Sequence, residues 1–177
     1  MYEIDDLDRV IELSNVPQSD VGAPLPLVVS DEQYLLLAYI VSEPDPEWDG
    51  TYATMVTPES DGLLIAIVQF RWPSAHMFGL PNDEAFDGHP LAARGLSPYA
   101  VFEVENSSWV REHERMNSVH PNHDRERFLA RQRHFIFAFH DSTFECLAEA
   151  FEISILRGTM RNAATRMVEM LAARPPA

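Results

Sequence analysis

Histidine is the side chain whose ordinary pKa lies closest to neutral pH, and all seven histidines of this chain fall between His76 and His140. A histidine beside a carboxylate is the smallest acid–base pair, because the carboxylate fixes the imidazole tautomer and makes the ring more basic. The first such group lies within residues 75–90 and comprises His76, Asn82, Asp83, Glu84 and His89. The competing interpretation is a short capped helical turn that ends at Gly88.

Residues 134–140 alternate in the way a strand does, with three phenylalanines on one face and His134 and His140 on the other. His140 and Asp141 come at the end of this strand, where side chains become available to a site. In the competing interpretation, Asp141 or Ser142 caps a following helix and His140 is a core histidine whose hydrogen bonds are satisfied. We expect His89 and His140 to line one concave site, with Asp83, Glu84 or Asp141 within hydrogen-bond reach.

Metal and cofactor sites are not expected. The third histidine group comprises His113, His120, His123 and Asp124, but Pro121 breaks the helix that would align its ligands. Residues 45–50 match only the first half of a calcium loop, because Val56 replaces the glutamate that completes such loops. There is no glycine-rich dinucleotide motif, and Cys146 is the only cysteine. We therefore expect no metal and no organic cofactor.

The composition excludes several classes of function. The 177-residue chain has 28 acidic and 13 basic residues and a net charge of −15, which opposes binding to nucleic acid or to an anionic membrane. All the basic residues are arginine, so P-loop and Schiff-base chemistry, which need lysine, are excluded. No apolar run is long enough to span a bilayer and no signal peptide is recognisable, so we expect a cytoplasmic protein. Arginine and alanine without lysine indicate a bacterial genome rich in G and C.

Charge is unevenly distributed along the chain. Residues 1–62 contain fourteen acidic residues and one arginine, whereas residues 125–133 contain four arginines around one glutamate. One interpretation is a solvated acidic surface and one basic helix face. In the other, the acidic third docks on Arg127 and Arg131, within the chain or across a homodimer. Alternatively, these two arginines bind a small anionic molecule, since a guanidinium group suits carboxylate and phosphate.

The elements that must position these groups follow from hydrophobic periodicity. Strands are predicted over residues 33–42, 63–72, 99–105 and 134–140, with a weaker one over 51–57. Helices are predicted over residues 1–13, from Ser107 or Ser108 to 117, from Asp124 to 133, over 143–151 and over 160–171. Residues 143–151 could instead form a return strand. Residues 73–98 are rich in proline, glycine and asparagine and are predicted to be irregular.

Strands cluster early and helices late, which favours an α+β fold over a regularly alternating one. We expect a single domain over residues 1–173, a mainly antiparallel sheet with helices concentrated in the C-terminal half, and a flexible tail over 174–177. Cys146 is interpreted as a buried, inert thiol, or else as a thiol activated by a helix N-terminus.

Two hypotheses of function remain. In the first, the protein is a small-molecule enzyme or ligand-binding protein whose histidine–carboxylate site combines residues 76–89, the His140 strand end and an arginine. In the second, it is a non-catalytic acidic module that binds another protein through its N-terminal third. Residues 43–62, with Trp48 between acidic residues, would then form the contact surface.

Overall fold

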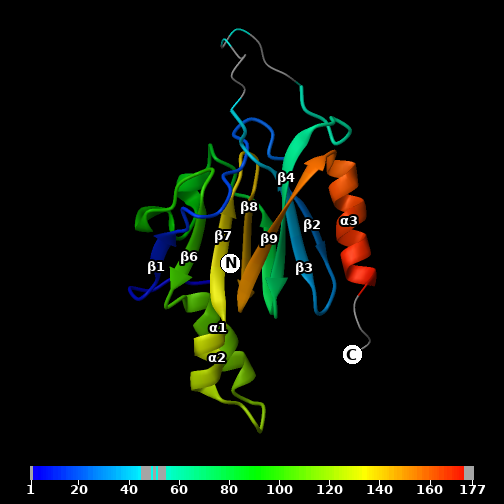
Figure 1. The fold of residues 1–177 in the computed structure, drawn as a ribbon. Coiled ribbons are helices and arrows are strands. Elements are labelled where there is room, and N and C mark those ends of the chain that lie inside the picture. The colour runs from blue at the N-terminus through cyan, green and yellow to red at the C-terminus, as the bar shows by residue number, and fades with distance from the viewer. Residues whose placement is uncertain (1, 45–48, 50, 52–54, 174–177) are drawn as a thin grey trace.

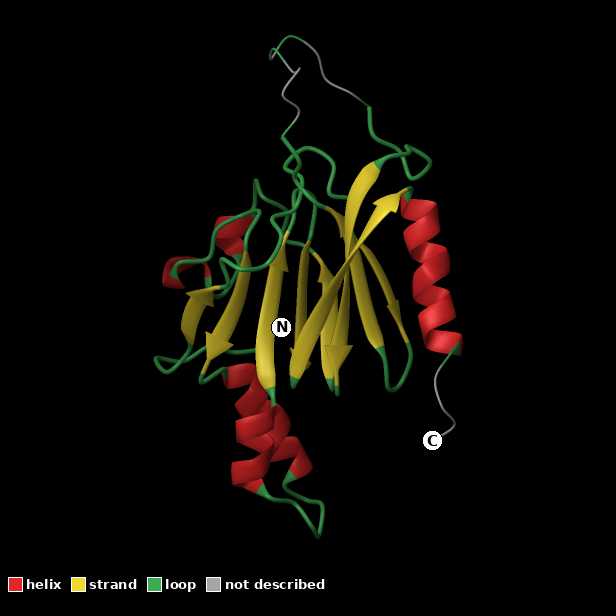
Figure 2. Cartoon of the chain, viewed as in Figure 1, coloured by secondary structure: helices red, strands yellow, loops and turns green. Residues whose placement is uncertain are grey.

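Two antiparallel β-sheets packed face to face form the body of the protein (Figures 1 and 2). The computed structural model describes residues 2–44, 49, 51 and 55–173. The five-stranded sheet has the order β1-β6-β7-β8-β5, and the four-stranded sheet has the order β2-β3-β4-β9. Within the described residues, all three α-helices lie in the C-terminal half, so the fold is α+β with mainly antiparallel sheet, as the sequence predicts.

The elements have the following bounds. The strands are β1 Arg9–Glu12, β2 Leu27–Ser30, β3 Leu35–Ile40, β4 Leu63–Arg71, β5 Ala75–Gly79, β6 Val101–Glu105, β7 Arg133–Ala138, β8 Thr143–Ala148 and β9 Ala150–Gly158. The helices are α1 Ser108–Asn117, α2 Arg125–Arg131 and α3 Met160–Ala172. Two short 3-10 turns, Phe86–Gly88 and Ala92–Arg94, lie in the connection from β5 to β6.

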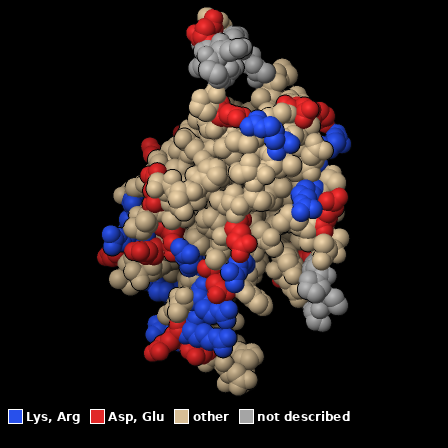
Figure 3. Space-filling view, in the orientation of Figure 1, with Lys and Arg blue, Asp and Glu red and all other residues tan. Residues whose placement is uncertain are grey.

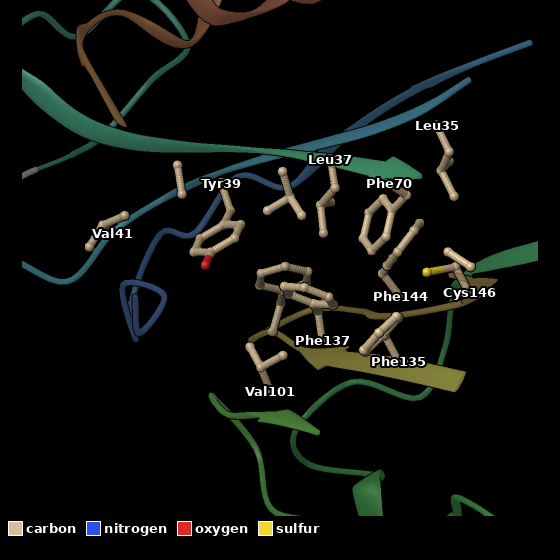
Figure 4. Close-up of a cluster of buried hydrophobic side chains, with 14 residues drawn as sticks. Leu35, Leu37, Tyr39, Val41, Phe70, Val101, Phe135, Phe137, Phe144 and Cys146 are labelled. Carbon is tan, nitrogen blue, oxygen red and sulfur yellow. The ribbon is translucent and has the colours of Figure 1, made fainter. Parts of the chain in front are cut away.

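The main core fills the space between the two sheets (Figure 4). Phe135 and Phe137 point inward from β7, and Phe144 does so from β8, because alternate residues of a strand face the same side. They meet Phe70 of β4, whose ring centroid lies 5.9 Å from that of Phe137 and 5.5 Å from that of Phe144. These aromatic contacts fix which face of β7 and β8 is turned inward.

The four-stranded sheet is also buried on its outer face, which explains why β3 is continuously apolar. Leu36 and Ile40 of β3 pack beneath α3, against Met160 and Met167. Thr159 begins α3 with a capping box in which its side chain and that of Asn162 satisfy each other's backbone N–H groups. Among the described residues, none of the helices has the length and apolar character that crossing a membrane requires.

The outer face of the five-stranded sheet is covered by irregular chain and by α1. Phe102, Ile136 and Leu147 on the sheet pack against a set of side chains from these covering segments, namely Tyr2, Phe86, Leu91, Leu96 and Trp109. Long loops and α1 therefore cover the outer face of this sheet, as α3 covers the outer face of the other sheet. Polar side chains on this face of β7 and β8 are buried beneath the loops, so they need partners.

The two sheets are joined at one corner, where the connection from β4 to β5 and the connection from β8 to β9 both pass from one sheet to the other. Arg71 pairs with Ala150 in one sheet and Ala75 pairs with Leu147 in the other. Three residues, beginning with Trp72, separate Arg71 from Ala75. Only two residues separate Leu147 from Ala150. The extra residue makes a bulge, and Trp72 there has a φ of 50°.

Several predicted elements are corrected by the structure. Residues 143–151 are not a helix: β8 pairs with β7 on one side and β5 on the other, so the return strand is the right alternative. Residues 1–13 contain the strand β1 rather than a helix, because β1 pairs with β6. The segment predicted as irregular contains β5, which completes the five-stranded sheet.

Other expectations are confirmed, and some lie outside the described residues. Ser107 caps α1, Asp124 caps α2, and α3 matches its predicted span. The long apolar strands and the alternation of residues 134–140 are also as predicted. Trp48, residues 52–54 of the strand expected over 51–57 and the tail 174–177 lie outside the described residues. The described residues 51 and 55–57 are not in a strand.

Replacing Phe137 by alanine is expected to reduce the free energy of unfolding by about 3–5 kcal/mol, because it opens a cavity between the sheets. Urea denaturation measures this loss. Phe78→Ala is the matched control, since Phe78 is 45% exposed, and it should cost less than about 1 kcal/mol. Equal losses for the two variants would contradict the assignment of the core.

Candidate functional site

His140 and Asp83 form a hydrogen-bonded pair beyond the end of β7 that lies away from α2 (Figure 1). Nδ1 of His140 lies 2.9 Å from Oδ2 of Asp83. The Tyr99 hydroxyl donates to the same Oδ2 and lies 3.1 Å from Nδ1 of His140. The Tyr99 and His140 rings stack with centroids 6.3 Å apart. Three segments that are separate in the sequence therefore meet in one cluster.

Backbone hydrogen bonds hold these segments together. The Asp83 N–H donates to the carbonyl of His140 at 2.9 Å, and Thr143 Oγ1 donates to the carbonyl of Pro81 at 2.8 Å. Tyr99 has a φ of 62°, a left-handed conformation that is unfavourable for a bulky side chain. The adjacent backbone is tied to the sheet, because the Ala138 N–H donates to the carbonyl of Ala100. The cluster is thus attached to the sheet on both sides.

The pKa shifts in this cluster indicate which side chains carry protons at neutral pH. The hydrogen bonds from Tyr99 and His140 lower the pKa of Asp83 below its usual 3.8, so this carboxyl is ionised at neutral pH. The hydrogen bond to Asp83 raises the pKa of Tyr99 to about 12, so the phenol keeps its proton. Because Asp83 can only accept, Nδ1 of His140 carries a proton and Nε2 keeps a lone pair.

The exposure of His140 and Asp83 decides whether the pair can exchange a proton with a molecule in solution. The His140 side chain is 40% exposed, whereas Asp83 is 17% exposed. Asp141, the other carboxylate near His140, is 88% exposed, and its Oδ1 lies 3.9 Å from Nε2. The arrangement therefore leaves one ring nitrogen able to take a proton while the other is held by a carboxylate, which is the geometry of a general base.

A second histidine–carboxylate cluster is buried beneath the loops that cover the five-stranded sheet. Glu145 on β8 lies 3.1 Å from Nε2 of His89 through Oε1 and 2.9 Å from Nε2 of His134 through Oε2. The Tyr2 hydroxyl donates to Oε2 at 2.8 Å. All four side chains are buried, with Glu145 only 5% exposed. We call this set the buried Glu145 cluster.

Hydrogen bonds to the far ring nitrogens complete the cluster. The Leu91 N–H donates to Nδ1 of His89, so His89 carries its proton on Nε2 and donates it to Glu145. Nδ1 of His134 lies 2.9 Å from Oγ of Ser107, the residue that caps α1. Burial raises the pKa of Glu145, but the hydrogen bonds from His134 and His89 outweigh burial and lower it to about 2. Glu145 is thus an ionised carboxylate whose role is to hold the covering segments on the sheet.

The expectation that His89 and His140 line one concave site is wrong. The His89 side chain has no exposed surface and is bound to Glu145, whereas His140 is bound to Asp83. The physical reason is that His89 follows a 3-10 turn whose Phe86 is anchored in the outer core, which carries the histidine under the loop. The expectation of a carboxylate within reach of His140 is confirmed by Asp83.

The other predicted residues in the first group lie apart from these clusters or support them. His76 on β5 is exposed, and partial burial lowers its pKa. Asn82 accepts the Ala85 N–H through Oδ1 at 3.1 Å, which is the capping role of the competing interpretation. Glu84 is exposed, and its N–H donates to Oδ1 of Asp83. The involvement of His76 and Glu84 in catalysis, and that of Asn82 in ligand binding, stay predictions.

The acidic third does not dock on the predicted arginines within the described part of one chain. Arg131 pairs instead with Glu149 at 3.1 Å. Described acids of the first third meet other arginines in the pairs Asp5–Arg111, Asp6–Arg94, Glu43–Arg157 and Glu59–Arg161. Docking across a homodimer and binding of an anion at Arg127 and Arg131 stay predictions.

Within the described residues, no three histidine, cysteine or carboxylate side chains are grouped as a metal site would require. In the third histidine group, Nε2 of His123 lies 2.9 Å from Oε1 of Glu114, and Arg125 approaches the other oxygen. Cys146 points into the core between the sheets, and burial raises the pKa of its thiol well above 9. The interpretation of an inert thiol therefore fits the structure.

Sequence reasoning missed Tyr99, Tyr2 and Glu145 as partners of the histidines. Glu145 was assigned to a helix, so its position beside His134 on the neighbouring strand could not be seen. Register supplies the signal: Ile136 faces Glu145 across the β7–β8 ladder, which puts His134 on the same outer side. Nothing in the local pattern around Tyr99 distinguishes it from a tyrosine at the start of a strand.

Similarity to known proteins does not identify a function for this site. No family model matches the chain, no curated protein matches it, and no solved structure matches it. The chemistry of the site is therefore inferred from its own distances, burial and charges.

The free energy of unfolding should fall in acid because Glu145 is ionised only in the folded chain there. Its folded pKa of about 2 lies below the ordinary 4.5, so its contribution is complete above pH 4.5 and is lost as the pH falls toward 2. This shift corresponds to roughly 3 kcal/mol. Urea denaturation should show that the difference in free energy of unfolding between wild type and Glu145→Gln is smaller at pH 3 than at pH 7.

Tyr2→Phe, which keeps the carboxylate and removes one hydrogen bond, is the control for this experiment and should cost roughly 1.5–3 kcal/mol at pH 7. A gap between wild type and Glu145→Gln that is the same at both pH values would contradict an ionised Glu145.

Asp83→Asn should lower the pKa of Tyr99 from about 12 toward the ordinary 10, because the charged acceptor that raises it is removed. Absorbance at 295 nm during an alkaline titration measures the phenolate, and Tyr99→Phe identifies which step belongs to this residue. An unchanged titration of Tyr99 in Asp83→Asn would show that the two side chains are not hydrogen-bonded in solution.

Proposed function

We propose that the protein is a small-molecule enzyme whose acid–base group is His140, oriented by Asp83 and Tyr99. The observation that carries this proposal is the 2.9 Å contact between Nδ1 of His140 and Asp83, made by a ring that is 40% exposed. The pair needs no organic cofactor to move a proton.

Asp83 gives His140 two properties that a general base requires. It holds the tautomer in which Nε2 is the acceptor, and its charge stabilises the imidazolium that forms when Nε2 takes a proton. Tyr99 keeps its proton and donates a hydrogen bond to Asp83, and its ring stacks on one face of the imidazole. A removed proton therefore resides on Nε2 of His140 and returns from there to the product or to water.

Exposure limits the substrate to a molecule that reaches Nε2 from solvent. Suitable reactions are those that begin with removal of a proton from bound water or from the substrate itself, such as hydrolysis of an activated ester. Asp141 stands 3.9 Å from Nε2 and disfavours an anionic group at that position. We therefore expect an uncharged reacting group.

The alternative of a non-catalytic acidic module receives less support. Several acids of the first third are already paired with arginines of the same chain, which leaves them less free to bind a partner. Trp48, the proposed anchor of that surface, lies outside the described residues. No observation of the described chain favours this function over the first.

The proposal is tested with p-nitrophenyl acetate, an uncharged activated ester whose hydrolysis releases a coloured phenolate. Wild-type protein should hydrolyse it faster than free imidazole at the same concentration and pH. His140→Gln should lower the rate by about 100-fold, in line with the usual contribution of a general base. Asp83→Asn should lower it at least about tenfold, because the tautomer of His140 is no longer fixed.

His120→Gln is the matched control, since His120 is an exposed histidine in the connection from α1 to α2 and is not part of the His140 cluster. It should leave the rate within about twofold of wild type, and circular dichroism should show all variants folded. A wild-type rate no greater than that of free imidazole, or an equal loss in His120→Gln and His140→Gln, would overturn the proposal.

A further inference from the structure

A cavity of about 470 Å³ lies between α2, the connection from α1 to α2 and the corner where the sheets meet. Its lining includes Trp72, His120, Arg127, Phe128, Arg131 and Glu149. Arg131 and Gln132 of the lining come just before β7, whereas His140 follows the other end of that strand. Its volume is that of a typical small-molecule site. The acid–base site does not use it.

The exposed side chain of Trp72 forms one wall of this cavity. Trp72 is 70% exposed and has a φ of 50°, a conformation that a bulky residue adopts only when its surroundings enforce it. Gln132 contacts the Trp72 carbonyl through Nε2 and accepts the Ser74 hydroxyl through Oε1 at 3.0 Å. The Glu149 N–H donates to the carbonyl of Arg71 on the other side. The backbone that carries the indole is thus held by hydrogen bonds on both sides.

Arginines gather over α1 and α2 at this end of a protein that is otherwise strongly acidic (Figure 3). Two of them, Arg127 and Arg131, line the cavity from one helix, four residues apart. Arg131 is paired with Glu149. Arg127 is exposed, and its guanidinium forms no ion pair with any described residue of the chain. One positive charge at the cavity is therefore left for a ligand.

The carboxylates near the cavity already have hydrogen-bond or ion-pair partners within the chain. Asp124 accepts the backbone N–H of Arg127 as the cap of α2, and Glu149 is bound by Arg131. Behind the lining, Glu114 contacts His123 and Arg125. The lining thus has two arginines and two carboxylates, with one guanidinium unpaired. These formal charges cancel, so a ligand with two or more negative charges is disfavoured, whereas Arg127 offers one guanidinium group to a single carboxylate.

His120 adds a further donor to the lining. The Asn122 N–H donates to Nδ1 of His120 at 3.2 Å, so the ring carries its proton on Nε2. Phe128, which also lines the cavity, is half-buried and adds a second apolar surface. The cavity therefore combines two aromatic surfaces with donors that suit a single carboxylate.

We propose that this cavity binds a planar aromatic monocarboxylate, whose ring lies on Trp72 and whose carboxylate is bound by Arg127. The guanidinium group supplies a pair of parallel N–H donors to the carboxylate. The indole provides a flat surface on which an aromatic ring stacks. Arg131 remains with Glu149 and fixes the side of the cavity. This site is independent of the acid–base chemistry proposed for His140.

The experiment uses 2-naphthoate as the probe, with binding measured by titration calorimetry and by quenching of tryptophan fluorescence. Two related compounds separate the contributions: 2-naphthalenemethanol has the ring without the charge, and 2-naphthyl phosphate has a higher charge. Wild-type protein should bind 2-naphthoate at least tenfold more tightly than either compound. Arg127→Gln should weaken binding of 2-naphthoate about tenfold, and Trp72→Ala should weaken it and abolish most of the quenching.

Arg166→Gln is the matched control, because Arg166 is an exposed arginine on α3, on the other sheet. It and His140→Gln should bind 2-naphthoate as wild type does, which separates this site from the proposed enzyme site. Three results would overturn the proposal: no binding of 2-naphthoate at millimolar concentration, equal binding of the uncharged alcohol, or tighter binding of the phosphate. Unchanged affinity in folded Arg127→Gln would also overturn it.

Discussion

The packing of three phenylalanines between the sheets decides where the polar groups of this protein lie. Once Phe135, Phe137 and Phe144 face the four-stranded sheet, the alternate residues of β7 and β8 must face the other way. Those residues include His134 and Glu145, which are then covered by loops and lose contact with water. An apolar contact on one side of the sheet thus creates the need for a hydrogen-bonded cluster on the other.

Two histidine–carboxylate pairs with the same chemical groups have different roles because their exposure differs. Glu145 is buried and accepts hydrogen bonds from His89, His134 and Tyr2, so its surroundings leave no room for a substrate. Asp83 is partly exposed, and its histidine partner presents a ring nitrogen to solvent. The contrast shows why a histidine beside a carboxylate in a sequence is only a starting point: Glu145 and Asp83 each have three hydrogen-bond partners, and the exposure of the histidine decides between a structural and a chemical role.

The sequence predicted what depends on local pattern. The caps at Ser107 and Asp124, the apolar strands and the helix after Thr159 follow from propensity and periodicity within a few residues. Residues 143–151 were misassigned because Phe144, Leu147 and Phe151 match helical spacing, while strand pairing on both sides imposed the other period. The contact of Asp83 with His140 was partly predicted, but Tyr99 was not, because a left-handed residue that joins two distant segments leaves no periodic trace.

The order in which the strands occur along the chain has a consequence during synthesis on the ribosome. β3 and β4 are among the most apolar segments, and they emerge long before β9 and α3, which complete and cover their sheet. Until then, the face that Leu36 and Ile40 present to α3 has no cover. A nascent chain of this protein therefore exposes an apolar surface until β9 and α3 have been synthesised, and such a surface promotes aggregation while it is exposed.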